Sequence, residues 1–248
     1  MNEPTRLPRT ALSRFLTWLG GHELGVLFAI GGVAAGVWAF ASIAEEVTEG
    51  DSQAVDRKLL LALRKPGTLA PIGPAALQEA ARDVSGLGGE TVLGALTIAV
   101  SCFLLLDGKK RMALFVCASV ASGLVVSVVL KAAFDRPRPD LVPYEANVST
   151  SSFPSGHSMM SAVTYLTLGA LLARSQERRR LKAYAILLGA GISFVVGVSR
   201  VYLGVHWPTD VLAGWTAGAS WAMLCWLIAV WLQNSRMLET EGEHVEDA

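Results

Sequence analysis

Hydrophobic residues occupy 52% of the 248 positions and charged residues only 17%, whereas a soluble globular domain carries about 25% charged residues. This composition excludes an ordinary soluble domain and predicts an integral membrane protein. The formal net charge of zero does not identify partners, because the charges are segregated along the chain, and no nucleic-acid partner is expected. No Cys/His cluster has zinc spacing and no acidic ladder resembles a calcium loop, so no metal or other cofactor is expected.

Six apolar stretches predict membrane-spanning helices, since a bilayer requires about 20 apolar residues per helix. In chain order they are Leu24–Ile43, Thr91–Leu106, Met112–Phe134, Ser158–Ala173, Leu181–Val198 and Val211–Leu232. The expected fold class is therefore all-α integral membrane, with six transmembrane helices forming one domain over residues 24–232. Residues 1–23 contain no signal-peptide cleavage site and are expected to be a cytoplasmic tail. Residues 233–248 are acidic and are expected to be a disordered cytoplasmic tail.

A polar connection, residues 44–90, separates the first two predicted spans. Within it Val55, Leu59, Leu60 and Leu63 recur at near-helical spacing, with charged residues interleaved. This pattern predicts an amphipathic helix lying in the plane of the membrane interface. A plain packing helix is an equal alternative.

The distribution of Lys and Arg among the short loops predicts the orientation of the protein in the membrane, because short loops rich in Lys and Arg stay in the cytoplasm. The loops concerned carry Lys109, Lys110 and Arg111 after the second span, and Arg174, Arg178, Arg179, Arg180 and Lys182 after the fourth. Both termini are expected on the same side. Residues 44–90, 135–157 and 200–210 are then expected at the outer face, together with the three motifs described next.

The first motif lies at the end of the third span, where Lys131, Arg136 and Arg138 are punctuated by prolines. Prolines stiffen the turn, an Arg fork matches phosphate oxygens, and a Lys acts as a point charge. The alternative is that these are ordinary juxtamembrane anchors and that Arg136 only pairs with Asp135.

The second motif, residues 154–157, contains Ser155, Gly156 and His157. Ser155 is a good helix cap, and Gly156 permits close approach of the backbone. The N–H groups of the helix start would bind phosphate oxygens, with His157 beside them as a proton donor. A capped helix start with an interfacial histidine is the alternative.

The third motif places Arg200 upstream of His206 and Asp210, with Pro208 near the start of the sixth span. Asp210 is four residues from His206, so the carboxylate can hold one ring nitrogen and leave the other as a nucleophile. A satisfied interfacial histidine is the alternative, but it does not account for Arg200.

Together the motifs resemble the signature of the type 2 phosphatidic acid phosphatase family, also called lipid phosphate phosphatases. That signature is Lys-x6-Arg-Pro, Pro-Ser-Gly-His and Ser-Arg-x5-His-x3-Asp. It is matched by Lys131, Arg138, Pro139, Pro154, Ser155, Gly156, His157, Ser199, Arg200, His206 and Asp210. The resemblance covers about residues 51 to 220 and implies a six-helix membrane fold with metal-independent phosphate ester hydrolysis. Soluble acid phosphatases and vanadium haloperoxidases share the signature, but the apolar spans argue against both.

The resemblance and the chemistry of the motifs together imply a role for each site residue. His206 attacks phosphorus to form a phosphohistidine, Asp210 orients its ring, and His157 protonates the leaving oxygen and later activates water. Phosphate oxygens are held by Lys131, Arg138, Ser155, Gly156 and Arg200. The two imidazoles are expected to start in different protonation states, which predicts a bell-shaped pH profile.

The motifs leave the substrate open. Candidates for a site facing the periplasm or exterior of a bacterial inner membrane are undecaprenyl pyrophosphate, phosphatidylglycerophosphate, phosphatidic acid and a lipid A phosphate. A phosphotransferase and a non-catalytic lipid-binding protein are the other readings, although binding alone would not require His157, His206 and Asp210. The sequence does not specify the oligomeric state.

Overall fold

The computed structural model describes residues 24–140 and 151–246, so the predicted N-terminal tail lies outside the described residues. All of the elements are helices, as expected. They are α2 (Leu24–Glu49), α3 (Gln53–Ala62), α4 (Ala75–Gly86), α5 (Glu90–Leu106), α6 (Lys110–Ala133), α7 (Gly156–Arg174), α8 (Arg179–Tyr202) and α9 (Pro208–Glu246).

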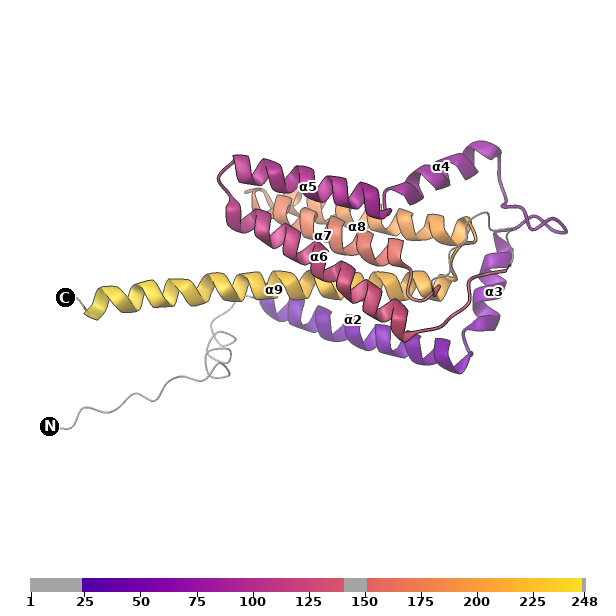
Figure 1. Cartoon of the computed structure of the whole chain (residues 1–248), viewed down its shortest axis with the longest axis horizontal. Coiled ribbons are helices and arrows are strands. Elements are labelled where there is room, and N and C mark those ends of the chain that lie inside the picture. The colour runs from indigo at the N-terminus through magenta and orange to yellow at the C-terminus, as the bar shows by residue number, and fades with distance from the viewer. Residues whose placement is uncertain (1–23, 141–150, 247–248) are drawn as a thin grey trace.

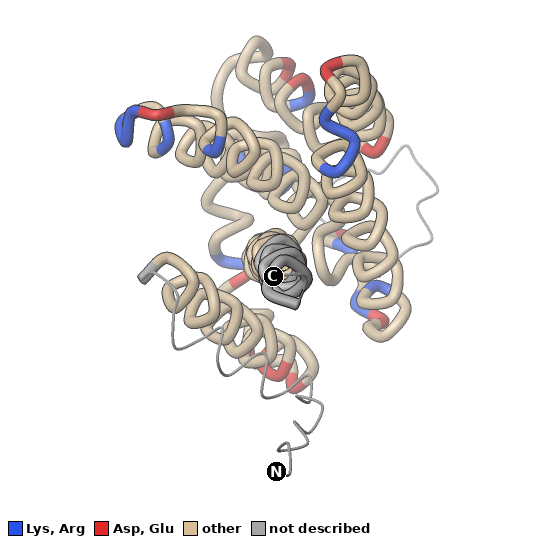
Figure 2. The backbone as a smooth tube through the Cα atoms, turned by 90° about the vertical axis from the view of Figure 1, so that its left-hand side faces the viewer, with Lys and Arg blue, Asp and Glu red and all other residues tan. Residues whose placement is uncertain are grey.

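The long helix α9 runs through the middle of the assembly (Figure 1). Helix α2 packs along one side of α9, and α7 packs on α9 from the other side, with α8, α6 and α5 beyond it. Figure 2, a view along the helices, shows charged residues mainly at turns and helix ends, with uncharged stretches between them. This distribution is typical of a membrane protein, because a charge in the hydrocarbon region is costly.

Four of these helices are long and apolar enough to cross a membrane, namely Gly25–Glu49, Lys110–Ala133, Arg179–Tyr202 and Pro208–Leu232. They coincide with the first, third, fifth and sixth predicted spans. The second predicted span becomes a fifth candidate only if α4 and α5, which meet at a bend of 49°, count as one broken span. The protein is thus a multi-pass membrane protein with four or five candidate spans.

The fourth predicted span coincides with α7, which is 19 residues long but is not apolar enough to be a candidate span. Its sequence is rich in serine and threonine, and Ser158, Ser161, Thr164 and Thr167 are all buried. Helix α7 packs against α5, α6, α8 and α9. A helix covered by protein on several sides faces little lipid, so its crossing of the membrane does not require a uniformly apolar surface.

Close backbone approach fixes α7 between its neighbours. A Cβ atom added at Gly169 would lie 2.8 Å from the Ala185 carbonyl oxygen of α8. One added at Gly214 of α9 would lie 2.7 Å from the Ser155 carbonyl oxygen, at the start of α7. Small residues permit such approaches in membrane helices, and these two contacts set the relative positions of the helices that carry the motifs.

The connection between α2 and α5 contains two helices rather than one. In α3 the outward-facing apolar residues are Val55 and Leu59, which are 59% and 50% exposed, while Asp56 and Leu60 are fully buried against the protein. The helix therefore presents a polar group inward, and α3 contacts the start of α9. The interfacial position of this helix stays a prediction.

The C-terminal segment differs from the expectation of a disordered tail. Helix α9 continues without interruption through Glu246. The segment after Gln233 is rich in glutamate and contains no proline, and this composition is compatible with continuation of a helix.

Candidate active site

The three motifs meet at one end of the helix assembly, where α6 and α8 end and α7 and α9 begin (Figure 1). The connection holding α3 and α4 lies at the same end, whereas the two basic loops predicted to be cytoplasmic lie at the opposite end. A cluster of the rings of Phe40, Phe134 and Phe153 ties α2 to the first two motifs, with centroids 4.9 to 6.3 Å apart. The apolar packing therefore holds the motif segments in register.

The second motif forms the start of α7 as predicted. Ser155 is the N-cap, and its hydroxyl oxygen accepts from the Ser158 N–H. Its own N–H donates to the Asp210 carbonyl oxygen at 2.9 Å, which joins the second and third motifs. Gly156 faces Lys131, since a Cβ there would lie 3.1 Å from the lysine Cε. A cation is thus held over the positive end of a helix, an arrangement suited to an anion.

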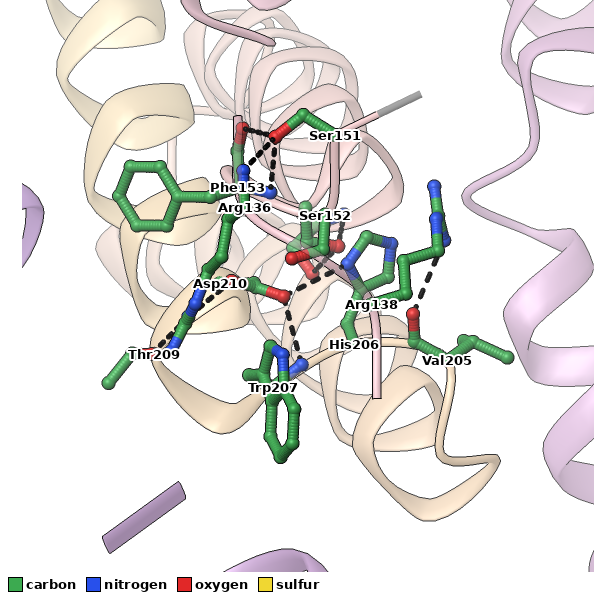
Figure 3. A network of polar contacts seen from close by, with 12 residues as sticks. Arg136, Arg138, Ser151, Ser152, Phe153, Val205, His206, Trp207, Thr209 and Asp210 are labelled. Atoms are coloured by element: carbon green, nitrogen blue, oxygen red, sulfur yellow. Dashed lines mark hydrogen bonds and ion pairs between the residues drawn. The ribbon is translucent and has the colours of Figure 1, made fainter. Parts of the chain in front are cut away.

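The third motif also has the predicted local geometry. His206 Nδ1 lies 3.4 Å from Asp210 Oδ2, and the Trp207 N–H donates to the same oxygen at 2.9 Å. Figure 3 shows the carboxylate between the ring and the Trp207 backbone. His206 is 2% exposed and Asp210 is fully buried. With Nδ1 turned to a carboxylate, Nε2 carries the lone pair that can attack phosphorus.

Three predicted cations surround the two histidines. Lys131 Nζ donates to the Ser151 carbonyl oxygen at 3.1 Å, and Arg138 Nη1 donates to the Val205 carbonyl oxygen at 3.2 Å. Arg200 Nη1 donates to the Ser85 hydroxyl of α4 at 2.8 Å. The three cations, which come from three different segments of the chain, all act electrostatically on His157.

The pKa values of both imidazoles lie below the usual range of histidine, which favours the neutral form of each ring at pH 7. The expectation that the two rings start in different protonation states stays a prediction. Burial, opposed by the Asp210 carboxylate, lowers the pKa of His206 to about 4. Burial, followed by the charge of Arg200, lowers the pKa of His157 to about 3. The sequence interpretation did not include the effect of the surrounding cations, which disfavour a positive charge on either imidazole ring.

Arg136 has a different position from the one considered from sequence. Instead of pairing only with Asp135, it donates from Nη1 to Asp210 Oδ1 at 2.6 Å and from Nη2 to Asp56 Oδ2 at 2.7 Å. Its side chain is 9% exposed. The guanidinium therefore bridges the buried carboxylates of Asp56 and Asp210. Figure 3 shows Arg136 beside Asp210, whose carboxylate also contacts His206.

Asp56 is one of the charged residues interleaved in the predicted amphipathic helix, and the structure places it beside the third motif. Its carboxylate accepts from Arg136, from the Thr209 N–H at 3.0 Å and from the Thr209 hydroxyl at 2.6 Å. Thr209 in turn accepts from Arg136 Nη1 at 2.8 Å. Arg136 and Thr209 lie 80 and 153 positions from Asp56 along the chain, so no local sequence pattern could have indicated these contacts.

A cavity of about 580 Å³ opens beside this network. Its lining comes from the end of α2, the start of α3, the segment after α6 and Trp207, and it includes Val47, Thr48, Gln53, Arg57, Phe134, Arg136, Arg138 and Trp207. The wall thus combines apolar side chains with three arginines, as the boundary between a lipid chain and a phosphate headgroup would require.

Comparisons with known proteins agree with this geometry. The model of the PAP2 superfamily matches residues 112–234. Phosphatidylglycerophosphatase B of Bacillus subtilis is 32% identical over 143 residues, which are 57% of this chain and 70% of that protein. Lipid A 1-phosphatase of Rhizobium etli is 30% identical over 187 residues, covering 62% and 74% respectively.

A solved structure shares the fold as well. The crystal structure of a transmembrane PAP2 type phosphatidylglycerolphosphate phosphatase from Bacillus subtilis superimposes with a TM-score of 0.64 and 27% identity. The match covers 79% of this chain and 93% of that one. The resemblance recognised in the three motifs is confirmed, and the chain belongs to the PAP2 superfamily.

Proposed function

We propose that this protein hydrolyses the phosphate ester or diphosphate of a membrane lipid through a phosphohistidine on His206. The observation that carries the proposal is the buried His206–Asp210 pair beside three cations and the capped start of α7. The relatives described above are named as phosphatases of lipid phosphates, and this chain is an enzyme of the same class, a phosphoric ester hydrolase.

In the first step, the lone pair of His206 Nε2 forms a bond to phosphorus while the bond from phosphorus to the lipid oxygen breaks. His157 donates a proton to that oxygen, and the lipid alcohol or monophosphate leaves. Asp210 stabilises the positive charge that develops on the His206 ring. Lys131, Arg138, Arg200 and the N–H groups at Ser155 and Gly156 hold the oxygens of the transferring group, since positioned charge is the main resource in phosphoryl transfer.

In the second step, a water molecule attacks the phosphohistidine and the phosphorus–nitrogen bond breaks. His157, now neutral, accepts a proton from that water, and inorganic phosphate leaves. Substrate binding changes the protonation state of His157. A bound phosphate brings negative charge close to His157, which raises its pKa and allows it to hold the proton required for the first step.

The site is proposed to face the periplasm or exterior, with six spans and both termini in the cytoplasm. Support comes from the two short basic loops, residues 107–111 and 174–182, which lie at the end of the assembly opposite the motifs. Helix α7 and the α4–α5 pair supply the two spans beyond the four clear ones. The domain that catalyses the reaction is proposed to be residues 24–232.

A phosphate-release screen tests the proposal. Purified protein in detergent is given phosphatidylglycerophosphate, undecaprenyl pyrophosphate, phosphatidic acid and a lipid A phosphate, with His206→Asn as the control. Release from at least one lipid by the wild type alone supports the proposal. No release from any of them overturns it. An added alcohol that becomes phosphorylated in place of water would instead indicate a phosphotransferase.

A further inference from the structure

The Asp56–Arg136–Asp210 cluster contains two carboxylates and one guanidinium, all almost completely buried. Arg136 shares its two Nη atoms between the carboxylates at nearly equal distances, 2.6 Å to Asp210 and 2.7 Å to Asp56. The three groups together carry one net negative charge. With His206 neutral, as in the resting state, the cluster of four groups also carries one negative charge.

That negative charge can offset the positive charge that the reaction places on the His206 ring. When His206 becomes phosphorylated on Nε2, its ring gains a positive charge. The one net negative charge of the four side chains, without the phosphoryl group, is then neutralised. Without Asp56 the Arg136 charge would be matched by Asp210 alone. The ring would then gain its positive charge next to an already neutralised carboxylate, in a site that also holds three other cations.

We propose that Asp56 is a positioning residue that acts as the counterion of Arg136 and so leaves the charge of Asp210 available to the His206 ring. The expected effect of Asp56 on kcat rests on the proposed function. The geometry supports the inference independently, because Asp56 holds Thr209 by both its N–H and its hydroxyl. Thr209 directly precedes Asp210, so the same carboxylate fixes the position as well as the charge of the catalytic aspartate.

Other charged or titratable groups face His206 and must remain constant in any test. They are Asp210 on α9, Arg138 after α6, Arg200 on α8, His157 on α7 and, beside His157, Lys131 on α6. None of them is changed in the variants proposed here. A shift in the behaviour of His206 can therefore be attributed to Asp56 and Arg136.

The experiment compares Asp56→Asn with the double variant Asp56→Asn/Arg136→Gln. The single variant has a net charge of zero over residues 56, 136 and 210, whereas the double variant regains the single negative charge of the wild type. We expect Asp56→Asn to lower kcat on the order of tenfold or more with little change in KM, because a nearby charge shifts a pKa by about one unit or more. The double variant should recover part of that loss.

Asp51→Asn is the matched control, because Asp51 is an exposed acidic residue five positions before Asp56 and ahead of the first residue of α3. It should behave as the wild type. If Asp56 only supported the fold, the double variant, which lacks both partners of the ion pair, would be less active than Asp56→Asn. That result, or unchanged kcat in folded Asp56→Asn, would overturn the inference.

A second measurement requires no turnover and separates this inference from the proposed function. The protein contains four histidines, so the His206 ring can be titrated by NMR in histidine-labelled protein with excess inorganic phosphate. The His206 pKa should fall in Asp56→Asn and return towards the wild-type value in the double variant. Equal values in all three proteins would contradict the inference, even if the wild type hydrolyses lipid phosphates well. If the wild type hydrolysed no lipid phosphate, that result would contradict only the proposed function.

Discussion

The ring of His206 has one nitrogen turned to Asp210 and is 2% exposed, and its other nitrogen is the proposed nucleophile. We expect His206→Asn to lower kcat on the order of a thousandfold or more, as removal of a nucleophile does elsewhere. Phosphate release and the thermal midpoint should be measured together. Near-normal turnover in this variant would exclude the phosphohistidine mechanism.

His157 is expected to show a different dependence on the substrate. As the proton donor, it matters less when the leaving group is already acidic. His157→Ala should therefore lose much more activity on a lipid alcohol ester than on an activated aryl phosphate. An equal loss on both substrates would show that His157 has another role.

The cations proposed to hold the phosphate are side chains rather than metal ions. Hydrolysis should therefore persist in excess EDTA, and vanadate, which adopts the five-coordinate shape of the transition state, should inhibit. The check is a phosphate-release assay with EDTA and then with added magnesium. A strict requirement for magnesium would contradict the assignment of Lys131, Arg138 and Arg200.

A site residue could be predicted from the sequence when its partner lies close to it along the chain. His206 and Asp210 are one helical turn apart, and Ser155 caps the helix that it precedes, so local rules predict both. Asp56 and Arg136 are 80 positions apart. The structure alone brings them together, and the lowered pKa values of both histidines likewise depend on burial and then on cations from other segments of the chain.

At the level of helices, α7 shows why an apolar pattern predicts some spans better than others. Helix α6 is predominantly apolar, and its predicted bounds agree with the observed ones within a few residues. Helix α7 is largely covered by protein, with eleven or so of its positions buried, including several serines and threonines. Its start could be predicted from the Ser155 cap, but its hydropathy does not decide whether it crosses the membrane.

The contact between α9 and the start of α7 gives a prediction at this scale. A methyl group at Gly214 would lie 2.7 Å from the Ser155 carbonyl oxygen and 3.1 Å from the Met159 nitrogen. Gly214→Ala should therefore lower the thermal midpoint and reduce hydrolysis, because overpacking costs about 1–3 kcal/mol and displaces the phosphate-binding helix start.

Gly191→Ala on α8 is the control for that substitution. No heavy atom outside the helix's own neighbourhood lies within 4 Å of a Cβ placed there, and alanine favours a helix over glycine. Its thermal midpoint and activity should match or slightly exceed those of the wild type. If Gly214→Ala behaved in the same way, the α7–α9 contact would not control the site.

For the whole molecule, the proposed orientation can be tested by labelling single cysteines. The three native cysteines, Cys102, Cys117 and Cys225, are first removed. Thr68, between α3 and α4, and Ser175, at the end of α7, are both exposed and lie on connections at opposite ends of the assembly. Thr68→Cys should react with an impermeant maleimide in intact spheroplasts, and Ser175→Cys only after lysis. The reverse pattern would place the site in the cytoplasm.

The ion pair between Asp56 and Arg136 also determines how the chain can be divided. The region matched by the superfamily, residues 112–234, contains all three motifs but not α3. A fragment beginning at α4 would hold every signature residue, yet its Arg136 would keep Asp210 and Thr209 and lose the Asp56 carboxylate, and losing one partner of a buried pair costs about 3–5 kcal/mol. Supplying residues 1–74 as a separate polypeptide should restore what that fragment lacks, so the smallest autonomous catalytic unit is defined by a contact and not by the span of its motifs.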